Sequence, residues 1–495
     1  MSPMMATPSS HVGSLALLAI ITVPLYYVWR CVYRYFFHPL ARYPGPKLAA
    51  VSELWHIWSM FSDREIFNIL DLHKKYGDVV RIGPNELSFA SSQAYQDIYN
   101  HTSKGKPRFL KTEFYDNGDP NPRITSARDP AVHARQRKAL SNAFSAKSLR
   151  DQEVVVQKYM DMLVKQLSVL GEDGKKALNM SAAFNWLTFD IIGDLAFGEP
   201  FGAVEEGRTP FWVSLILDAT FTALMATMVK RKIPLLKPFM SFVLPKGADE
   251  KRKAHYAMSK EKARKRIQAG DTGRDDFFSH MLKKGTMSES EIVSQASTLI
   301  VAGSETTATS LAGTTWYLLK NPDAMSKLQD EVRGAFDSLD QITGDTTVGM
   351  PYLHGVIEES LRLFPPAALG LPRYSPGTLV DGHYVPAGTT VSVNPLTTAR
   401  DPRYWHEPES FIPERWIGEG LNDERKASQP FSSGPRACLG INLAYMEMRI
   451  ILAKIVFAYD WELAVPLDTW MESCTNRLLW EKPDLMVKYH PRVAV

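Results

Sequence analysis

The residues best suited to chemistry lie in one stretch near the C-terminal end, 431–440. Cys438 lies there between Gly434 and Gly440, two residues after Arg436. The residue that follows Cys438 opens an apolar run with helical spacing, which predicts a buried helix directly after the cysteine. The sulfur is therefore expected at a helix N-terminus, where free backbone N–H groups and the positive end of the helix dipole favour a thiolate.

A thiolate held in this way is the axial ligand that a haem needs for oxygen–oxygen bond cleavage, because it pushes electron density onto the iron. The two glycines let the backbone lie close to a flat ring. Phe431 is expected to keep water off the sulfur, and Arg436 to pair with a haem propionate. The alternative is a buried, inert cysteine at an ordinary loop–helix junction.

A second cluster, 302–306, interrupts the apolar middle of a long predicted helix. The helix is expected to begin at Ser288, which forms a capping box with Glu291, and to end at Lys320 before Pro322. A mid-helix glycine and a buried carboxylate are both unfavourable in such a helix. A locally unfavourable cluster of this kind indicates a functional site.

The chemistry of dioxygen explains the cluster, because its reduction at a haem needs two protons, open space and shielding from bulk water. Gly303 would open the space, Thr306 would hydrogen-bond to dioxygen, and Glu305 would relay protons. The alternative is a glycine-kinked helix whose threonines bond back to the preceding turn.

Two further pairs have helical spacing. His133 and Arg137 share one helix face and could reach one anionic partner, although a solvated basic face is an equal alternative. Glu359 and Arg362 are spaced to form an ion pair, which is a common feature and a weak signal by itself.

Together these motifs resemble the cytochrome P-450 monooxygenases. The pattern Phe-x-x-Gly-x-Arg-x-Cys-x-Gly over 431–440 is similar to the family's haem-binding loop, and 302–306 matches its acid–alcohol motif without departure. His133 and Arg137 resemble the family's Trp-x-x-x-Arg propionate clamp, with His in place of Trp. Glu359 and Arg362 resemble its Glu-x-x-Arg pair.

The resemblance implies further roles. Arg415 would complete a buried triad that holds the cysteine loop, and Arg373 would meet a propionate. The implied residues are Glu305 and Thr306 for catalysis; Cys438 for the iron; His133, Arg137, Ala302, Gly303, Arg373, Phe431, Gly434, Arg436 and Gly440 for the haem; Glu359, Arg362 and Arg415 for the triad; and Ala367, Ala368 and Leu369 for the substrate pocket.

Composition and the N-terminus indicate the compartment. A net charge of +3 gives no indication of a nucleic-acid partner, and three cysteines are too few for a disulfide framework. Residues 12–29 carry no charge and predict a transmembrane helix after a lumenal segment, 1–11. A signal peptide is the rival, but no basic n-region or small-x-small cleavage site is present. Arg30 and Arg34 follow the span, which predicts an endoplasmic reticulum membrane protein with a cytosolic body.

The expected fold is mainly α with small β-sheets, the cytochrome P-450 fold that the resemblance implies. A basic, proline-rich hinge over 30–48 would join the anchor to a single large domain over 49–495. Within that domain, the segments 79–82 and 86–89 predict a β-hairpin.

The resemblance implies a haem b monooxygenase that inserts one atom of O2 into a hydrophobic small molecule. Electrons from NADPH would come through NADPH–cytochrome P-450 reductase, and cytochrome b5 is a second possible partner. Stretches 38–49 and 75–87 are similar to fungal members such as the hydroxylases of trichothecene and aflatoxin-type pathways, which predicts a terpenoid or polyketide mycotoxin substrate. The alternatives are xenobiotic or fatty-acid hydroxylation, a haem–thiolate isomerase or dehydratase that needs no reductase, and a haem sensor without turnover.

Overall fold

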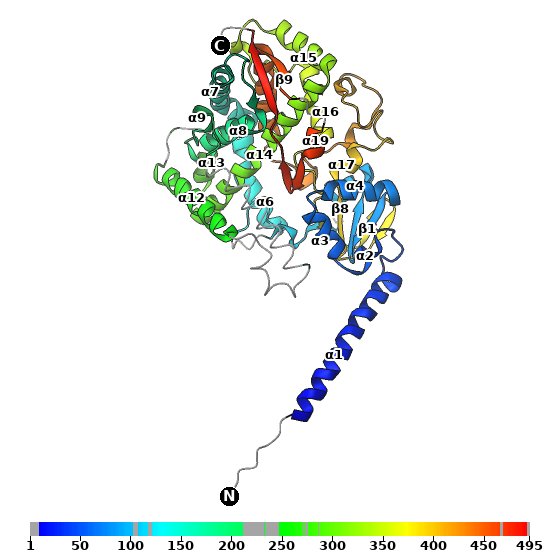
Figure 1. The fold of residues 1–495 in the computed structure, drawn as a ribbon. Helices are drawn as coiled ribbons and strands as arrows, with labels where there is room; N and C mark the ends of the chain where they lie inside the picture. Colours follow the sequence, from blue (N-terminus) through cyan, green and yellow to red (C-terminus); the bar gives the residue numbers. More distant parts are fainter. Residues whose placement is uncertain are drawn as a thin grey trace.

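Helices dominate the structure, and strands form small sheets at two sides of the helical body (Figure 1). The computed structural model describes residues 9–101, 107–116, 121–210, 232, 247–270, 273, 276–285, 287–465 and 469–492. The prediction of a mainly helical fold with small β-sheets is confirmed over these residues.

The helices of the body are mostly amphipathic or fully buried. Their bounds are α2 Lys47–Val51, α3 Leu54–Phe61, α4 Glu65–Tyr76, α5 Ser92–Tyr99, α6 Pro130–Leu140, α7 Ala146–Gly171, α8 Met180–Phe197, α9 Ala203–Glu206, α12 Ala248–Gln268, α13 Phe277–Lys284, α14 Glu289–Lys320, α15 Pro322–Ala335, α16 Pro351–Leu363, α17 Pro395–Ala399, α18 Ile441–Ala458 and α19 Trp470–Ser473. Short helical turns are η2 Glu113–Tyr115, η3 Ser141–Phe144, η5 Leu339–Gln341, η6 Pro413–Trp416, η7 Arg425–Ala427 and η8 Gly434–Arg436.

The strands pair in four sheets among the described residues. The largest has the order β1-β2-β8-β5-β3, and the others are β4-β12-β9, β6-β7 and β10-β11. The strand bounds are β1 Val79–Gly83, β2 Glu86–Phe89, β3 Leu110–Lys111, β4 Leu178–Asn179, β5 Arg373–Tyr374, β6 Thr378–Val380, β7 His383–Val385, β8 Thr390–Val393, β9 Tyr459–Leu463, β10 Thr475–Arg477, β11 Leu479–Glu481 and β12 Met486–Pro491. The predicted hairpin is confirmed, since β1 and β2 pair antiparallel.

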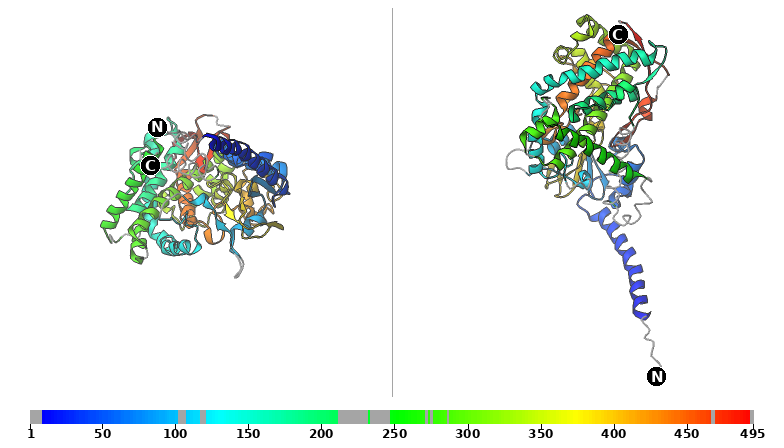
Figure 2. Two further views of the ribbon diagram at one scale, coloured as in Figure 1. Left: turned by 90° about the horizontal axis from the view of Figure 1, so that it is seen from below. Right: turned by 90° about the vertical axis from the view of Figure 1, so that its left-hand side faces the viewer.

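The long helix α14 runs through the helical body, against α8, α12, α16 and α18 (Figure 2). Ser288 caps it with the predicted capping box: its hydroxyl accepts from the backbone of Glu291, and the Glu291 side chain accepts from the backbone of Ser288. The helix ends at Lys320, as predicted, and nearly all of its middle is buried. It is the element that carries the 302–306 cluster across the interior.

The N-terminal helix α1, Ser9–Val32, continues into the π-helical turn η1, Tyr33–Phe37, and projects away from the body (Figure 1). The structure does not support the predicted transmembrane helix over 12–29. Within the described part of the chain, no helix combines the length and the apolar character needed to span a bilayer. Pro24 lies inside α1.

Candidate active site

The cysteine loop leaves the turn η8 and enters α18. The backbone N–H of Cys438 donates to the carbonyl of Phe431 at 2.8 Å, which closes the loop. Helix α18 begins at Ile441 rather than directly after the cysteine, because Gly440 is its N-cap. The sulfur therefore precedes the first helical residue by three positions, and its thiol is exposed to the site.

Glycine is needed at the two positions of the loop for different structural reasons. Gly434 has a φ of +68°, and a Cβ there would lie 2.3 Å from the carbonyl oxygen of Tyr99, so both its conformation and its packing require glycine. Gly440 has a φ of −88°, which any residue adopts, and its Cβ would meet only the Phe144 ring at 3.7 Å. Gly440 instead lines an open cavity, where a missing side chain leaves room for a flat ring.

The pKa of the Cys438 thiol is raised by burial, and the backbone N–H of Gly440 and the positive charge of Arg137 oppose that rise. The dipole argument from the sequence is therefore outweighed by desolvation in the protein alone. A bound metal ion deprotonates a coordinating thiol outright, so this direction does not count against ligation.

A cavity of about 390 Å³ lies beside the cysteine. Its wall contains Cys438 and Phe431 from the loop, and Ala302, Gly303 and Thr306 from α14. Its lining also includes these other predicted site residues: His133, Arg137, Ala367, Arg373, Arg436 and Gly440. Residues from widely separated parts of the chain thus meet around one space, as the family resemblance implied.

Basic side chains gather on one part of this wall. Arg373 and Arg436 are joined there by Lys111, which is 8% exposed, and by His133 and Arg137. Burial and the charges of Arg373 and Arg436 hold the pKa of Lys111 well below its usual range. Burial and these cations also lower the pKa of His133 to about 3, so that its imidazole is neutral at physiological pH.

The hydrogen bonds of this basic cluster lead to neutral acceptors. Arg436 donates to the carbonyl of Ala127 at 2.6 Å, Arg137 to that of Ala437 at 2.7 Å, and Lys111 to that of Thr125 at 2.5 Å. Arg373 donates to the hydroxyl of Tyr115 at 2.5 Å. Among the described residues, no carboxylate forms an ion pair with any of the five basic side chains.

Buried cations without counter-charges are costly, so the cluster is suited to an anionic ligand. The two propionates of haem b are such anions, and the free thiol and the largely apolar cavity fit the rest of that group. The residues present therefore fit haem b with Cys438 as its axial ligand. His133 would contribute a neutral N–H rather than a charge.

On α14, the structure brings Thr306 to the cavity but turns Glu305 away from it. The Thr306 hydroxyl donates to the carbonyl of Ala302 at 2.8 Å, the back-bond that the alternative interpretation foresaw. Gly303 lets α8 approach closely, since a Cβ there would lie 2.7 Å from the Cδ1 atom of Ile192. Among the described residues, only part of the 302–306 cluster thus lines the cavity.

The predicted triad is present and fully buried. Arg362 donates to Glu359 through Nε at 2.8 Å and Nη2 at 2.7 Å, and Arg415 donates through Nε at 2.9 Å. Trp416 adds its indole N–H to Glu359 Oε2 at 2.9 Å. The side chains of Glu359, Arg362 and Arg415 have no exposed surface, which gives this cluster a structural role away from the cavity.

The three predicted pocket residues lie in three different environments. Ala367 lines the cavity, whereas Ala368 is buried in the core and Leu369 faces a second cavity near α1 and α3. Gly434, the remaining predicted cofactor residue, packs against α5 instead of lining the cavity.

Sequence reasoning missed three side chains of this site. Lys111 ends β3 and Tyr115 ends the turn η2, and neither residue belongs to a motif that points to a function. Glu447 on α18 also lines the cavity, and its carboxyl bonds to Thr307. Burial raises the pKa of Glu447 to about 8, and its place in an apolar helical run was the available signal.

Comparisons with known proteins agree with this geometry. The family model Cytochrome P450 matches residues 44–489. The chain is 43% identical to cytochrome P450 monooxygenase BOA3 of Botryotinia fuckeliana, over 96% of this chain and 95% of that protein. It is 42% identical to cytochrome P450 monooxygenase astJ of Aspergillus oryzae (94% and 95%), and 39% identical to cytochrome P450 monooxygenase poxC of Penicillium oxalicum (94% and 92%). The chain therefore belongs to the cytochrome P450 family.

Proposed function

We propose that this protein is a haem-dependent monooxygenase that inserts one oxygen atom into a hydrophobic small molecule. The observation that carries the proposal is the meeting of the Cys438 thiol and an unneutralised basic cluster at one cavity. The family implies haem with cysteine thiolate ligation, and the haem, when bound, supplies the activation of dioxygen. The reaction consumes substrate, O2, two electrons and two protons, and it yields hydroxylated product and water.

The chain's own residues have separate roles in this proposal. Cys438 holds the iron, and Arg373, Arg436 and Lys111 neutralise the propionates. The apolar part of the cavity wall excludes water. Thr306 offers a hydroxyl at the cavity, and Glu305, the neighbouring residue, supplies protons to it.

The two electrons come from NADPH through a separate reductase, for which NADPH–cytochrome P-450 reductase is our candidate, with cytochrome b5 as a possible second donor. This dependence is typical of the family. It also separates the proposal from a haem–thiolate isomerase or dehydratase, which would turn over without NADPH.

The substrate class follows from the relatives. The relatives compared are fungal monooxygenases, and 43% identity over nearly the whole chain supports a related task in fungal secondary metabolism. We infer a polyketide or terpenoid substrate of the kind found in mycotoxin pathways. A cavity of about 390 Å³ with a mainly apolar lining suits a small hydrophobic molecule.

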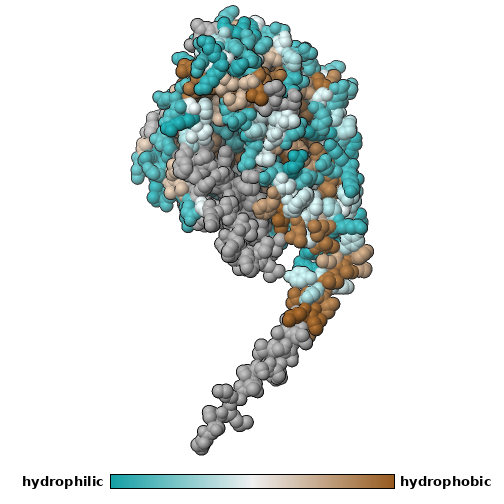
Figure 3. Space-filling view, viewed as in Figure 1, coloured by the Kyte–Doolittle hydropathy of each residue, from teal (hydrophilic) through white to brown (hydrophobic). Residues whose placement is uncertain are grey.

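We also propose that the protein works at the endoplasmic reticulum membrane, with its catalytic body in the cytosol. Apolar side chains are exposed near the base of α1, where the surface is coloured as hydrophobic (Figure 3). They are Val28, Trp29, Phe36 and Phe37 on α1 and η1, and Leu48, Leu54, Trp58 and Phe61 on α2 and α3. A continuous exposed apolar surface of this kind suits contact with lipid.

The first experiment is the carbon monoxide difference spectrum of the dithionite-reduced protein. We expect the strongly red-shifted Soret band of thiolate-ligated haem in the wild type and its loss in Cys438→Ala. Cys474→Ala is the matched control, because Cys474 is buried outside the cavity and its replacement should keep the band. A wild-type spectrum typical of histidine ligation, or no haem at all, would refute the proposed function. NADPH consumption with reductase and a set of terpenoids and polyketides then tests the substrate class.

A further inference from the structure

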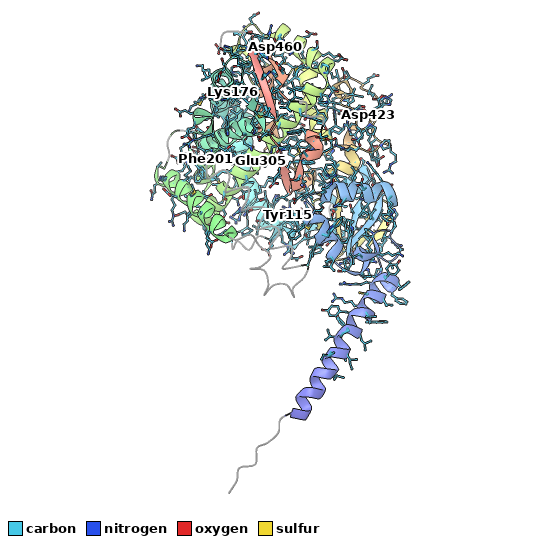
Figure 4. The ribbon with its side chains drawn as sticks, in the orientation of Figure 1. Tyr115, Lys176, Phe201, Glu305, Asp423 and Asp460 are labelled. Atoms are coloured by element: carbon cyan, nitrogen blue, oxygen red, sulfur yellow. The ribbon has the colours of Figure 1, made fainter. Side chains whose placement is uncertain are left out.

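Glu305 and Lys482 form an ion pair in the interior, although 177 residues separate them. The side chain of each is 3% exposed, and the ammonium contacts the Oε1 atom of Glu305 directly. Figure 4 labels Glu305 near the middle of the helical body. Desolvation offsets much of the attraction in a buried pair, so stability is a weak reason for its presence.

The ammonium of Lys482 is held by more than the carboxylate. It donates to the hydroxyl of Thr309 at 2.8 Å and lies 3.5 Å from the carbonyl oxygen of Trp480. Thr309 in turn donates to Glu305 Oε1 at 3.3 Å. One oxygen of the carboxylate is therefore surrounded by donors that come from α14 and from the end of β11.

The backbone that carries Lys482 is braced against the core. The Trp480 ring stacks on Phe364 with a centroid distance of 4.3 Å, and its indole N–H donates to the carbonyl of Pro365 at 2.8 Å. Trp480 is 2% exposed. The hairpin of β10 and β11 thus fixes the origin of the Lys482 side chain, so that the ammonium defines where Oε1 of Glu305 lies.

The second carboxylate oxygen is free. Glu305 Oε2 is buried and has no hydrogen-bond partner in the part of the chain that the structure describes. The next residue, Thr306, lines the cavity, as do Ala302 and Gly303 one turn earlier. Glu305 is therefore the chain neighbour of a residue of the cavity wall, and its carboxyl group has one oxygen bound and one oxygen without a partner.

Other ionisable groups around this part of α14 have partners of their own or lie beside Lys482. Asp190 of α8 accepts from the backbone of Phe201 and Val204, and Asp194 bonds to the Tyr159 hydroxyl. Glu447 of α18 bonds to Thr307, and the Cys474 thiol lies within the field of the Lys482 charge. Among the described residues, Lys482 is the cation in contact with Glu305.

We propose that Lys482 is the positioning residue of Glu305: it binds Oε1 and leaves Oε2 as the oxygen that exchanges protons with the site. This inference rests on the proposed role of Glu305 in proton supply. The carboxylate takes a proton from water at Oε2 and then passes it toward Thr306, so it returns to its starting state after each transfer. The C-terminal hairpin thereby takes part in proton supply without contacting substrate.

The test uses the haem-loaded protein with reductase, NADPH and O2, and no organic substrate. The readout is the fraction of NADPH electrons released as hydrogen peroxide rather than water, measured against pH, because proton supply decides between these products. Lys482→Met removes the cation that binds Oε1 of Glu305. It is therefore expected to shift the profile and to raise the fraction of electrons released as hydrogen peroxide, with an unchanged carbon monoxide spectrum.

Further variants separate a positioning role from a structural one. Lys482→Arg should restore the wild-type profile, since it returns a cation. Lys454→Met is the matched control: Lys454 is also buried and paired, but its partner is Asp161 at 2.5 Å and not Glu305. If Lys482→Met fails to fold, Lys482→Gln replaces it, because the amide still donates to Oε1 and Thr309 while lacking the charge.

The double variant Glu305→Gln/Lys482→Met tests whether Lys482 acts through Glu305. If Lys482 acts through Glu305, then Glu305→Gln removes the pH dependence, and adding Lys482→Met to it changes nothing further. A Glu305→Gln profile equal to the wild type would overturn the proton-supply role itself. Two outcomes would overturn only the positioning role, provided that the Glu305→Gln profile differs from the wild type. In the first, the profile of Lys482→Met equals the wild-type profile. In the second, Lys482→Met has the same effect in the double variant as it has alone.

Discussion

Lys111 adds a cation to the residues that would bind the haem propionates. The motifs assigned the propionates to His133, Arg137, Arg373 and Arg436, but His133 is neutral at physiological pH because its pKa is lowered to about 3. Lys111 lies in the same cluster, buried and without a carboxylate partner among the described residues. Burial and the charge of Arg373 disfavour the charged ammonium of Lys111, and an anion bound in the cavity would favour it again.

Lys111→Met is therefore expected to weaken haem retention. A charge-assisted hydrogen bond contributes about 1.5–3 kcal/mol, which corresponds to haem loss faster by roughly ten- to a hundredfold. Haem transfer from the protein to an apo-globin acceptor measures the rate. Lys147→Met, at an exposed position outside the cavity, is the control and should match the wild type. An unchanged rate in Lys111→Met would contradict the assignment.

The elements around the site are joined by buried polar groups as well as by apolar packing. Helix α16 carries Glu359 and Arg362, and the turn η6 carries Arg415 and Trp416, so the cluster ties these two elements together. Arg362 also donates to the carbonyls of Ala399 and Pro408, which extends the connection to the end of α17 and to the segment after it. These bonds join α16, η6 and the end of α17 into one buried frame.

Glu359→Gln is expected to destabilise this frame strongly. It leaves the buried guanidinium of Arg362 without its counter-charge, whereas Arg415 keeps its pair with Asp423. A loss of about 3–5 kcal/mol in the free energy of unfolding is typical when one partner of a buried pair is removed. Urea unfolding followed by tryptophan fluorescence measures it. Glu206→Gln removes an exposed pair with Arg208 and should leave the midpoint nearly unchanged. Equal midpoints for the two variants would show that the buried cluster is dispensable.

On the scale of the whole protein, one catalytic cavity lies inside the helical body and an apolar surface lies outside it at the base of α1. In the view of Figure 3 the hydrophobic colour passes from α1 onto the adjoining surface of the body. Residues of α1 do not line the cavity. Attachment and catalysis should therefore be separable.

Deletion of residues 1–32 is expected to weaken membrane attachment while the carbon monoxide spectrum stays unchanged. Adding Trp58→Ser and Phe61→Ser should release the remaining attachment, because burial of each large apolar side chain contributes about 1.5–3 kcal/mol. Flotation with vesicles that contain anionic lipid measures binding, and extraction at high pH of the full chain distinguishes a surface contact from an inserted one. Full attachment of the triple variant would refute this assignment.

Much of the fold and of the site was predictable from the sequence, wherever the signal is local. The capping box at Ser288, the β1–β2 hairpin and the cysteine loop depend on neighbours within a few residues, so their residue types specify them. The family motifs added Arg373 and Arg415, which local patterns do not connect to the site. The start of α18 moved by two residues because Gly440 became its cap.

The predicted transmembrane helix over 12–29 rested on composition and not on contacts between neighbouring residues. A charge-free run of residues 12–29 indicates apolar character, but a span also requires enough hydropathy along a continuous helix, and no described helix reaches it. Exposed apolar side chains beside that helix, on α2 and α3, are scattered along the sequence and become one surface only in the fold. The sequence therefore predicts membrane contact, and the structure does not support the transmembrane helix that it also predicted.

Residue types and spacing were enough to predict the cysteine loop and the long central helix, because both depend on contacts between neighbours in the chain. The same motifs were enough to identify the family. Tertiary structure alone decided that Lys111 joins the basic cluster and that Glu305 turns from the cavity to Lys482. These pairings join segments hundreds of residues apart. Their physical reason is the packing of several helices and a hairpin around one cavity, which sets the distances and desolvation that no local pattern encodes.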